Sequence, residues 1–243
     1  MNEQGKAQDY AFLTNLVAGL VHEIKNPLTT INLNLQLLKE DWHDAESQRE
    51  KKTLRKLDVI QTETQRLKEI LDDFLKFVRI DDLDLKPLDI NALLDEIVEF
   101  LSNELKQRNV EVIRFYDYNL PRCAVDVKFM KQAFLNILLN AGQAIETNGQ
   151  IMVRTSRDGD RVRVEITDTG AGMPPETLAK IFTPWFSTKA SGTGLGLPTT
   201  RRIIEEHGGS IQVQSEPQRG TSVVIHLIPR IPQDNETAEH PTL

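Results

Sequence analysis

Apolar residues in the first third of the chain recur at alternating spacings of four and three. In the first series they occupy positions 17, 21, 24, 28, 31, 35 and 38. The second series comprises Leu57, Ile60, Leu67, Leu71, Phe74 and Val78, with Thr64 as its one polar interruption. A repeat of 3.5 residues is typical of coiled coils and helical bundles. The polar stretch 40–52 between the two series suits a turn, so we expect a helical hairpin.

This hairpin has an apolar face too wide to be buried against itself. Two copies that associate would bury the face in a four-helix bundle. We therefore expect a homodimer built on this part of the chain.

The pattern changes after the acidic, proline-containing segment 81–87. Alternating strand-like runs at 110–116, 123–125, 150–156, 161–167, 210–215 and 221–228 are interspersed with helical patterns at 90–107, 127–146 and 196–206. Strands that mostly follow strands, with helices grouped, favour an α+β two-layer sandwich with helices on one face. The predicted fold class is thus a helical hairpin (α) forming a dimeric four-helix bundle, followed by an α/β sandwich. The expected domains are 1–82, a linker at 83–87, a second domain at 88–232 and a disordered tail at 233–243.

Composition narrows the function classes. The 243 residues carry a net charge of −7 without a cationic block, which argues against nucleic acid as a partner. No apolar run approaches the roughly 18 residues that a membrane helix needs. Cys123 is the only cysteine, which excludes a disulfide framework or a thiolate metal site. We expect a soluble, cytoplasmic protein with no membrane span.

A histidine beside a carboxylate is the first candidate for chemistry. His22 and Glu23 lie within the first helical pattern, and Pro27 follows one turn later. A lone histidine on a helix is usually only solvated. Pro27, however, removes a backbone donor and should bend the helix near His22, and such strain tends to be retained at functional sites.

Two asparagines and an aspartate are the next candidates. Asn136 and Asn140 lie four apart on one face of an otherwise apolar helix, where amide oxygens could hold Mg²⁺ or simply satisfy each other's hydrogen bonds. Asp168 ends a strand before Gly170 and Gly172. Its carboxylate could accept a hydrogen bond from an exocyclic amine, which favours adenine over guanine, although an aspartate before a glycine turn is also common without a ligand.

A glycine-rich loop leads into the helix predicted at 196–206. It reads Gly192-Thr193-Gly194-Leu195-Gly196. Glycines let backbone amides approach phosphate, and a helix N-terminus is a natural anion site. A flexible loop without a ligand is the ordinary alternative. The chain has no G-x-x-x-x-G-K-[ST] loop and no lysine and His-Arg-Asp set of the protein-kinase type.

These segments, in this order, resemble the H, N, G1 and G2 boxes of sensor histidine kinases of two-component systems. The resemblance covers nearly all of residues 10–229. Within the family the chain is similar to the soluble, nitrogen-regulator-like kinases. These have a HisKA-type dimerisation and phosphoacceptor domain followed by a GHKL-type ATPase domain. It implies ATP as substrate, Mg²⁺ on Asn140, and a lid at 181–189. The residues it implies for nucleotide binding are Asn136, Asn140, Asp168, Gly170, Gly172, Thr188, Lys189, Gly192, Thr193, Gly194, Leu195, Gly196 and Thr221.

The resemblance also implies a reaction. A ring nitrogen of His22 attacks the γ-phosphorus of ATP while Glu23 holds or deprotonates the other nitrogen, and the phosphoryl group passes to an aspartate of a response-regulator receiver domain. In similar kinases a residue at the position of Asn26 orients water for dephosphorylation of the regulator. Transfer within one protomer and transfer across the dimer both fit the sequence, because the handedness of the turn at 41–52 decides between them.

Two other functions also fit some of these motifs. One is a dimeric ATP-binding scaffold without phosphotransfer, as in chaperone and mismatch-repair relatives, but those need a catalytic glutamate where this chain has Gln132. A serine kinase of the mitochondrial dehydrogenase type would share the ATP-binding half without explaining His22 and Glu23. Only 21 residues precede His22, so we expect the signal to come from a separate sensory partner, or the chain to be part of a larger sensor.

Overall fold

The computed structural model describes residues 3–40, 47–78, 80, 83–189 and 192–229, with side chains described from Val21 onward except that of His22. The chain divides into two compact units, Met1–Asp81 with Ile181–Thr199, and Asp82–Lys180 with Thr200–Leu243. The predicted tail at 233–243 lies outside the described residues. Within the described ranges, no helix is long and apolar enough to cross a membrane.

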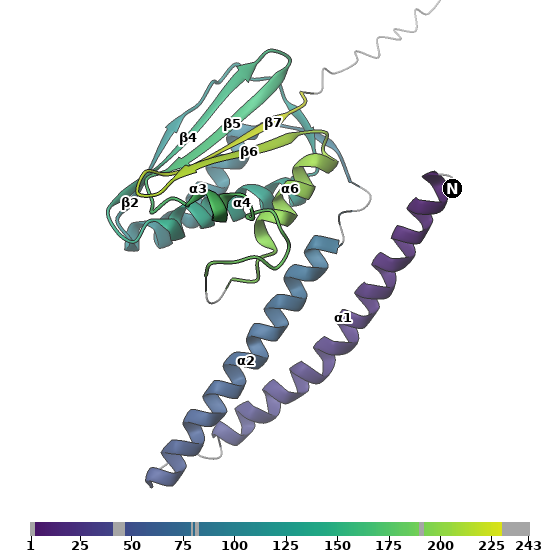
Figure 1. Cartoon of the computed structure of the whole chain (residues 1–243), viewed down its shortest axis with the longest axis vertical. Coiled ribbons are helices and arrows are strands. Elements are labelled where there is room, and N and C mark those ends of the chain that lie inside the picture. The colour runs from purple at the N-terminus through teal and green to yellow at the C-terminus, as the bar shows by residue number, and fades with distance from the viewer. Residues whose placement is uncertain (1–2, 41–46, 79, 81–82, 190–191, 230–243) are drawn as a thin grey trace, which may run out of the picture. The chain divides into compact units, whose positions relative to one another are not determined.

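The first unit contains the predicted hairpin. Helix α1 spans Glu3–Glu40 and continues through Pro27, and α2 spans Gln48–Val78 (Figure 1). A reciprocal capping box starts α2, because the Glu50 N–H donates to Ser47 Oγ at 3.2 Å and the Ser47 N–H donates to a Glu50 carboxylate oxygen at 2.9 Å. Lys25 of α1 pairs with Asp72 of α2. Residues 41–46 of the predicted turn lie outside the described residues.

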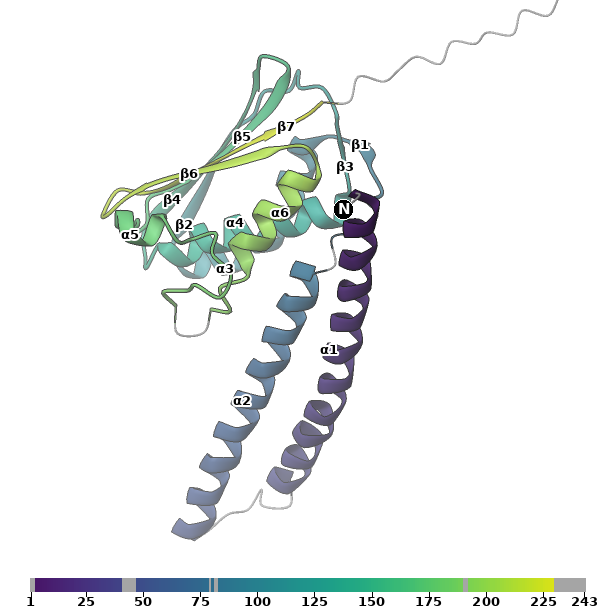
Figure 2. The same ribbon diagram turned by 45° about the vertical axis from the view of Figure 1, so that its right-hand side comes forward.

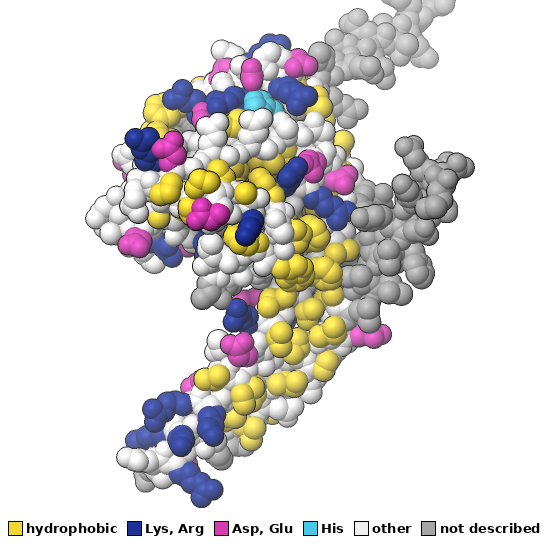
Figure 3. Space-filling model, in the orientation of Figure 1, with side chains coloured by type: hydrophobic (Ala, Val, Ile, Leu, Met, Phe, Trp, Pro, Cys, Tyr) yellow, Lys and Arg dark blue, Asp and Glu magenta, His cyan; other side chains and the backbone are white. Residues whose placement is uncertain are grey.

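The heptad residues of the hairpin form two rows that differ in exposure. Val21, Leu35 and Thr64 lie between the helices and are 3–7% exposed. Thr64 satisfies its hydroxyl by donating to the carbonyl of Ile60 at 2.8 Å. The other row is 44–50% exposed and consists of Ile24, Ile31, Leu38, Ile60 and Leu67. Hydrophobic side chains accordingly gather along the hairpin (Figure 3). Among the heptad residues whose side chains are described, the hairpin alone fully buries only Val21, Leu35 and Thr64.

The second unit is built around a five-stranded mixed sheet. Its strands are β2 (Val110–Phe115), β4 (Gly149–Asp158), β5 (Arg161–Asp168), β6 (Ser210–Glu216) and β7 (Gly220–Leu227), in the order β2-β4-β5-β7-β6. The β2–β4 pair is parallel and the others are antiparallel. Strands β1 (Lys86–Leu88), which overlaps the expected linker at 83–87, and β3 (Cys123–Val125) form a separate antiparallel pair.

Three longer helices accompany this sheet. They are α3 (Ile90–Gln107), α4 (Val127–Ala144) and α6 (Gly196–Glu206), and both ribbon views place them along the same face (Figures 1 and 2). A short helix, α5, spans Pro175–Leu178. On β5 the side chains of Val162, Val164 and Ile166 are at most 1% exposed, while the alternating residues remain partly exposed. This arrangement confirms the predicted fold class of a helical hairpin followed by a two-layer α+β domain.

The start of α4 is fixed by a buried histidine. Asp126 caps α4 by accepting hydrogen bonds at Oδ1 from the N–H groups of Lys128 (3.0 Å) and Phe129 (3.2 Å). Its own N–H donates to His207 Nε2 at 2.9 Å, while His207 Nδ1 lies 2.7 Å from the carbonyl oxygen of Ile203. This pairing requires the neutral ring with its proton on Nδ1. The helix that carries Asn136 and Asn140 is therefore anchored at its first turn.

Candidate functional site

Asp168 is a buried carboxylate at the end of β5. It is 5% exposed, and its Oδ1 accepts hydrogen bonds from the N–H groups of Gly170 (2.8 Å) and Thr221 (3.3 Å). Burial raises the pKa of Asp168 above its ordinary value, although the two backbone amides favour the charged form. Both amides bind the same oxygen, so the orientation of the carboxylate is fixed by the backbone.

The glycines around Asp168 are required by the protein's own backbone. A Cβ on Gly172, whose φ is +63°, would lie 1.9 Å from the carbonyl oxygen of Glu216, and one on Gly170 would lie 2.5 Å from that of Ala144. Gly220, with φ +87°, is equally close to the carbonyl of Asp168. The close packing of the protein's own backbone therefore explains why these positions are glycines. Close approach of a base to them remains a prediction.

Asn136 and Asn140 are brought together on α4, as their spacing predicts. Asn140 Nδ2 donates to Asn136 Oδ1 at 3.4 Å, and Asn136 Nδ2 donates to Thr200 Oγ1 of α6 at 2.8 Å. The sequence interpretation missed Thr200. The spacing signals only its burial, because Thr200, Ile203 and Ile204 share one face of α6 and are all buried.

The chemistry of these side chains fits a magnesium ion carried by a nucleotide. Among the described residues, no group of three or more His, Cys, Asp or Glu could hold a metal ion. Mg²⁺ instead accepts one or two hard oxygen ligands from protein and completes its shell with phosphate oxygens and water. Since the Asn140 amide nitrogen is turned toward Asn136, its amide oxygen is the atom directed elsewhere, as such a ligand requires.

The glycine-rich loop is held by short-range backbone contacts within the first unit. The Trp185 N–H donates to the carbonyl of Gly194 at 3.2 Å, and the Gly192 N–H donates to that of Lys189 at 3.1 Å. A Cβ on Gly194, whose φ is +71°, would lie 2.6–2.8 Å from the backbone of Trp185 and Phe186. Gly196 begins α6, Leu195 is 1% exposed, and Thr188 and Lys189 are exposed.

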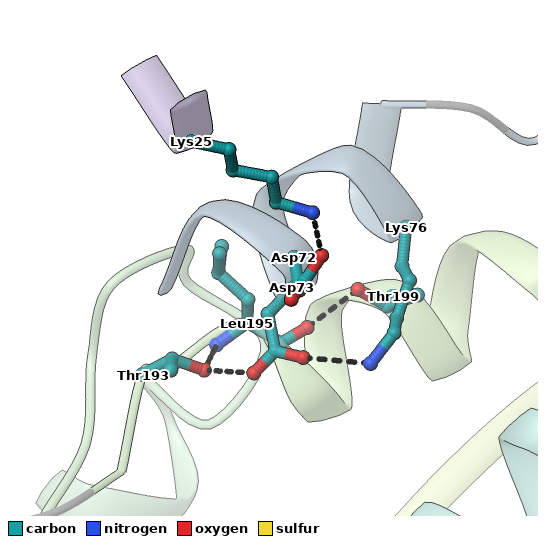
Figure 4. Close-up of polar contacts among 7 residues, drawn as sticks. All are labelled: Lys25, Asp72, Asp73, Lys76, Thr193, Leu195 and Thr199. Carbon is teal, nitrogen blue, oxygen red and sulfur yellow. Dashed lines mark hydrogen bonds and ion pairs between the residues drawn. The ribbon is translucent and has the colours of Figure 1, made fainter. Parts of the chain in front are cut away.

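Thr193 of this loop contacts α2. Its Oγ1 donates to Asp73 Oδ2 at 2.9 Å and accepts from the Leu195 N–H at 3.4 Å (Figure 4). Asp73 also pairs with Lys76 at 3.1 Å, and the rings of Phe74 and Trp185 lie 5.8 Å apart. The hydroxyl that could bind a phosphate oxygen is therefore engaged by a carboxylate.

The predicted phosphoacceptor lies in α1. The backbone of His22 is helical, and its side chain lies outside the described part of the structure. Glu23 and Asn26 are exposed. Pro27 has no N–H to donate to the carbonyl of Glu23 four residues earlier, so the helix loses one hydrogen bond beside His22. The structure therefore places these residues on the hairpin and the Asp168 and Asn136–Asn140 groups in the second unit.

Comparison with known families assigns both halves of the chain. The model described as "His Kinase A (phospho-acceptor) domain" matches residues 12–83. The model described as "Histidine kinase-, DNA gyrase B-, and HSP90-like ATPase" matches residues 125–231. The chain belongs to the histidine kinase family. The family resemblance drawn from the four sequence boxes is thereby confirmed.

Individual histidine kinases align with most of the chain. The sensor histidine kinase ZraS of Escherichia coli (strain K12) is 34% identical over 226 residues, which are 93% of this chain and 48% of ZraS. The chain thus spans about half the length of this relative. Full-length ShkA in complex with AMPPNP superposes with a TM-score of 0.70 at 27% identity, covering 88% of this chain and 45% of ShkA. The histidine kinase ThkA in complex with the response regulator protein TrrA gives a TM-score of 0.65 at 27% identity, covering 94% and 65%.

Proposed function

We propose that this chain is the phosphoacceptor and catalytic part of a two-component protein-histidine kinase. One observation carries the proposal: a single chain joins a buried, backbone-held Asp168 in an ATPase-type domain to a helix bearing His22 and Glu23. The ATPase domain supplies a nucleotide site, and the hairpin supplies a nucleophile. Family domains of both kinds in one chain support this pairing.

Asp168 selects adenine. Its Oδ1 is occupied by the amides of Gly170 and Thr221, so Oδ2 receives the exocyclic amine of the base. The N-terminus of α6 and the loop from Gly192 to Gly196 bind the phosphates through backbone amides, and Lys189 of the lid supplies a cation. The AMPPNP complex of the similar kinase ShkA supports ATP as the nucleotide.

Asn140 would hold Mg²⁺ through its amide oxygen, with Asn136 beside it. The ion would supply positive charge that offsets the negative charge of the phosphates. The chain's own contribution is to orient the two carboxamides and the triphosphate so that the γ-phosphoryl group is in line with its acceptor.

His22 is the acceptor. A ring nitrogen forms a bond to the γ-phosphorus as the bond from that phosphorus to the β-phosphate oxygen breaks, and ADP leaves. Glu23 accepts a hydrogen bond from the other ring nitrogen or removes its proton, which makes the attacking nitrogen more nucleophilic. The phosphoryl group then passes to an aspartate of a response-regulator receiver domain. The ThkA–TrrA complex of a similar kinase supports such a partner.

The kinase acts as a homodimer. The exposed row of Ile24, Ile31, Leu38, Ile60 and Leu67 is the surface that a second hairpin covers in a four-helix bundle. Asn26, four residues after His22 on the same helix, orients water for dephosphorylation of the regulator. If Asn26→Ala left the dephosphorylation rate of the regulator unchanged, that role would be wrong. A scaffold without phosphotransfer is not favoured, since residues 12–83 match a phosphoacceptor domain.

The test is incubation of the purified chain with γ-labelled ATP and Mg²⁺. We expect acid-labile, alkali-stable label on the wild type and none on His22→Gln, as for a phosphoramidate on His22. Label that persists in His22→Gln would refute the assignment. Nucleotide binding without label, even with the purified sensory partner added, would favour the scaffold instead.

A further inference from the structure

Three polar side chains form a hydrogen-bonded row in the second unit. Thr200, 1% exposed on α6, accepts a hydrogen bond at Oγ1 from Asn136 Nδ2 (2.8 Å). Asn136 Oδ1 in turn accepts one from Asn140 Nδ2 (3.4 Å). The row runs from the interior of the domain toward Asn140, and in it each amide turns its nitrogen toward the Thr200 side.

The direction of the row matters because a carboxamide has two different ends. The oxygen accepts hydrogen bonds and binds hard cations, whereas the NH₂ group only donates. With its nitrogen turned to Thr200, Asn136 directs its oxygen toward Asn140. Asn140 must then direct its nitrogen toward Asn136 and its oxygen to the opposite side. A rotation of either amide by 180° would place two donors or two acceptors face to face.

We propose that Thr200 is a positioning residue that presents the amide oxygen, and not the nitrogen, of Asn140 to Mg²⁺. This inference rests on the proposed function, in which Asn140 is the metal ligand. Thr200 lies four residues beyond the first residue of α6, so it also ties the magnesium side chains of α4 to the helix that follows the phosphate-binding loop. Occupation of the metal site and the position of α6 are thereby linked by one hydroxyl.

The chain offers a matched pair of substitutions. Thr200→Val keeps the shape of the side chain and removes the hydroxyl. Thr199→Val does the same at the neighbouring residue, which is 4% exposed and whose hydroxyl donates to the carbonyl of Leu195 (2.7 Å), outside the row. Thr200→Ser restores a hydroxyl at the original position and serves as the rescue.

The measurement is calorimetric binding of ADP to the full chain, first in EDTA and then across a Mg²⁺ titration. For Thr200→Val we expect ADP affinity in EDTA to remain within about twofold, and the Mg²⁺ concentration for half-maximal enhancement to rise about three- to tenfold, as loss of one hydrogen bond allows. Thr199→Val should match the wild type, and Thr200→Ser should recover most of the effect.

The Asn140→Ala variant distinguishes a failure of the proposed metal site from a failure of the positioning role of Thr200. If Asn140→Ala leaves the Mg²⁺ dependence unchanged, the proposed metal site itself is wrong. If Asn140→Ala raises the Mg²⁺ requirement and Thr200→Val does not, the site stands and the positioning role is overturned. Equal loss of ADP affinity with and without Mg²⁺ in Thr200→Val would also overturn it. Should Thr200→Val fold poorly, Thr200→Ala and Thr200→Ser are compared in the same titration. A Mg²⁺ requirement that is the same in Thr200→Ala and Thr200→Ser would then overturn the positioning role.

Discussion

Replacing Asp168 by asparagine should reverse the base preference of the nucleotide site. The amides of Gly170 and Thr221 both donate to Oδ1, so the carboxamide of Asp168→Asn must place its oxygen there. Its NH₂ group then occupies the position of Oδ2. The 6-amino group of adenine would meet a second donor, whereas the 6-oxo group of hypoxanthine in inosine nucleotides would meet the donor it needs.

The size of the effect follows from the bond that is exchanged. A hydrogen bond to a charged partner contributes about 1.5–3 kcal/mol, which corresponds to roughly a 10- to 150-fold loss of ADP affinity when it is removed. The new neutral bond to hypoxanthine contributes about 0.5–1.5 kcal/mol, or roughly a two- to tenfold gain for IDP. The ratio of the two affinities should therefore change by at least about 20-fold.

Competition of ADP and IDP against a fluorescent nucleotide measures both affinities on the same sample. The wild type should prefer ADP, and Asp168→Asn should prefer IDP or bind the two equally. An Asp168→Asn protein that is folded and still binds ADP within about twofold of the wild type would refute the assignment of Asp168 to the adenine amine. A parallel loss of both nucleotides would indicate a distorted loop and would equally contradict the reasoning.

The same variant should gain stability at neutral pH. Burial raises the pKa of Asp168 above its ordinary value of 3.8, so the ionised carboxylate costs stability once the pH exceeds that value. The cost grows until the pH passes the folded-state pKa and is absent in acid, where the group is protonated in both states. Asp168→Asn should thus unfold at higher urea concentration than the wild type at pH 7, and the difference should vanish below about pH 4. Equal midpoints at pH 7 would contradict this.

Four further substitutions test the packing, the loop contact and the dimer. Gly220→Ala should lower the unfolding free energy by more than about 2 kcal/mol, because its Cβ would lie 1.9 Å from a carbonyl oxygen at φ +87°. Gly159→Ala, at φ +60° with open space around it, should cost only about 1 kcal/mol in the same urea titration, and similar losses would contradict the packing argument. Asp73→Ala should raise ADP affinity about two- to tenfold, since the hydroxyl of Thr193 no longer has to leave a carboxylate, and unchanged affinity would show that the contact does not compete. Ile31→Glu should weaken dimerisation at least tenfold in sedimentation equilibrium, and an unaltered dimer would place the interface elsewhere.

Much of the fold follows from local pattern. The helices at 90–107 and 196–206 and the strand at 123–125 have the predicted bounds, because capping residues, glycines and changes of hydrophobic period mark their ends. Gly208 and Gly209 close α6, with N–H groups that donate to Glu205 and Ile204. Strand β1 and helix α5 were not predicted, since three or four residues carry no measurable period and depend on long-range pairing.

The candidate site likewise contains residues that local sequence pattern predicts and residues that it does not. The sequence predicted Asp168, Asn136 and Asn140 as site residues from residue type and spacing, and the structure brings the two asparagines into hydrogen-bond contact. It did not identify Thr200 or Asp73, because each reaches its partner across 64 or 120 residues of chain. Contacts between such distant residues depend on the tertiary structure, and a single sequence does not encode them as a local pattern. The side-chain environment of His22 remains a prediction.

Asp168, the proposed contact for the base, also belongs to the sheet, which explains why glycines flank it. Asp168 pairs with Thr221 in the register of β5 and β7, and the Thr221 N–H donates to the carboxylate of its own strand partner. Gly220 lies directly before that pair, and a Cβ added to it would lie 1.9 Å from the carbonyl oxygen of Asp168. A side chain at Gly220 would therefore push β7 away and turn the carboxylate at the same time. Loss of stability and loss of nucleotide affinity should accompany each other at Gly220, whereas Asp168→Asn should separate them, with affinity falling as stability rises. Only a carboxylate kept buried for a ligand, at a cost to the empty protein, predicts both results.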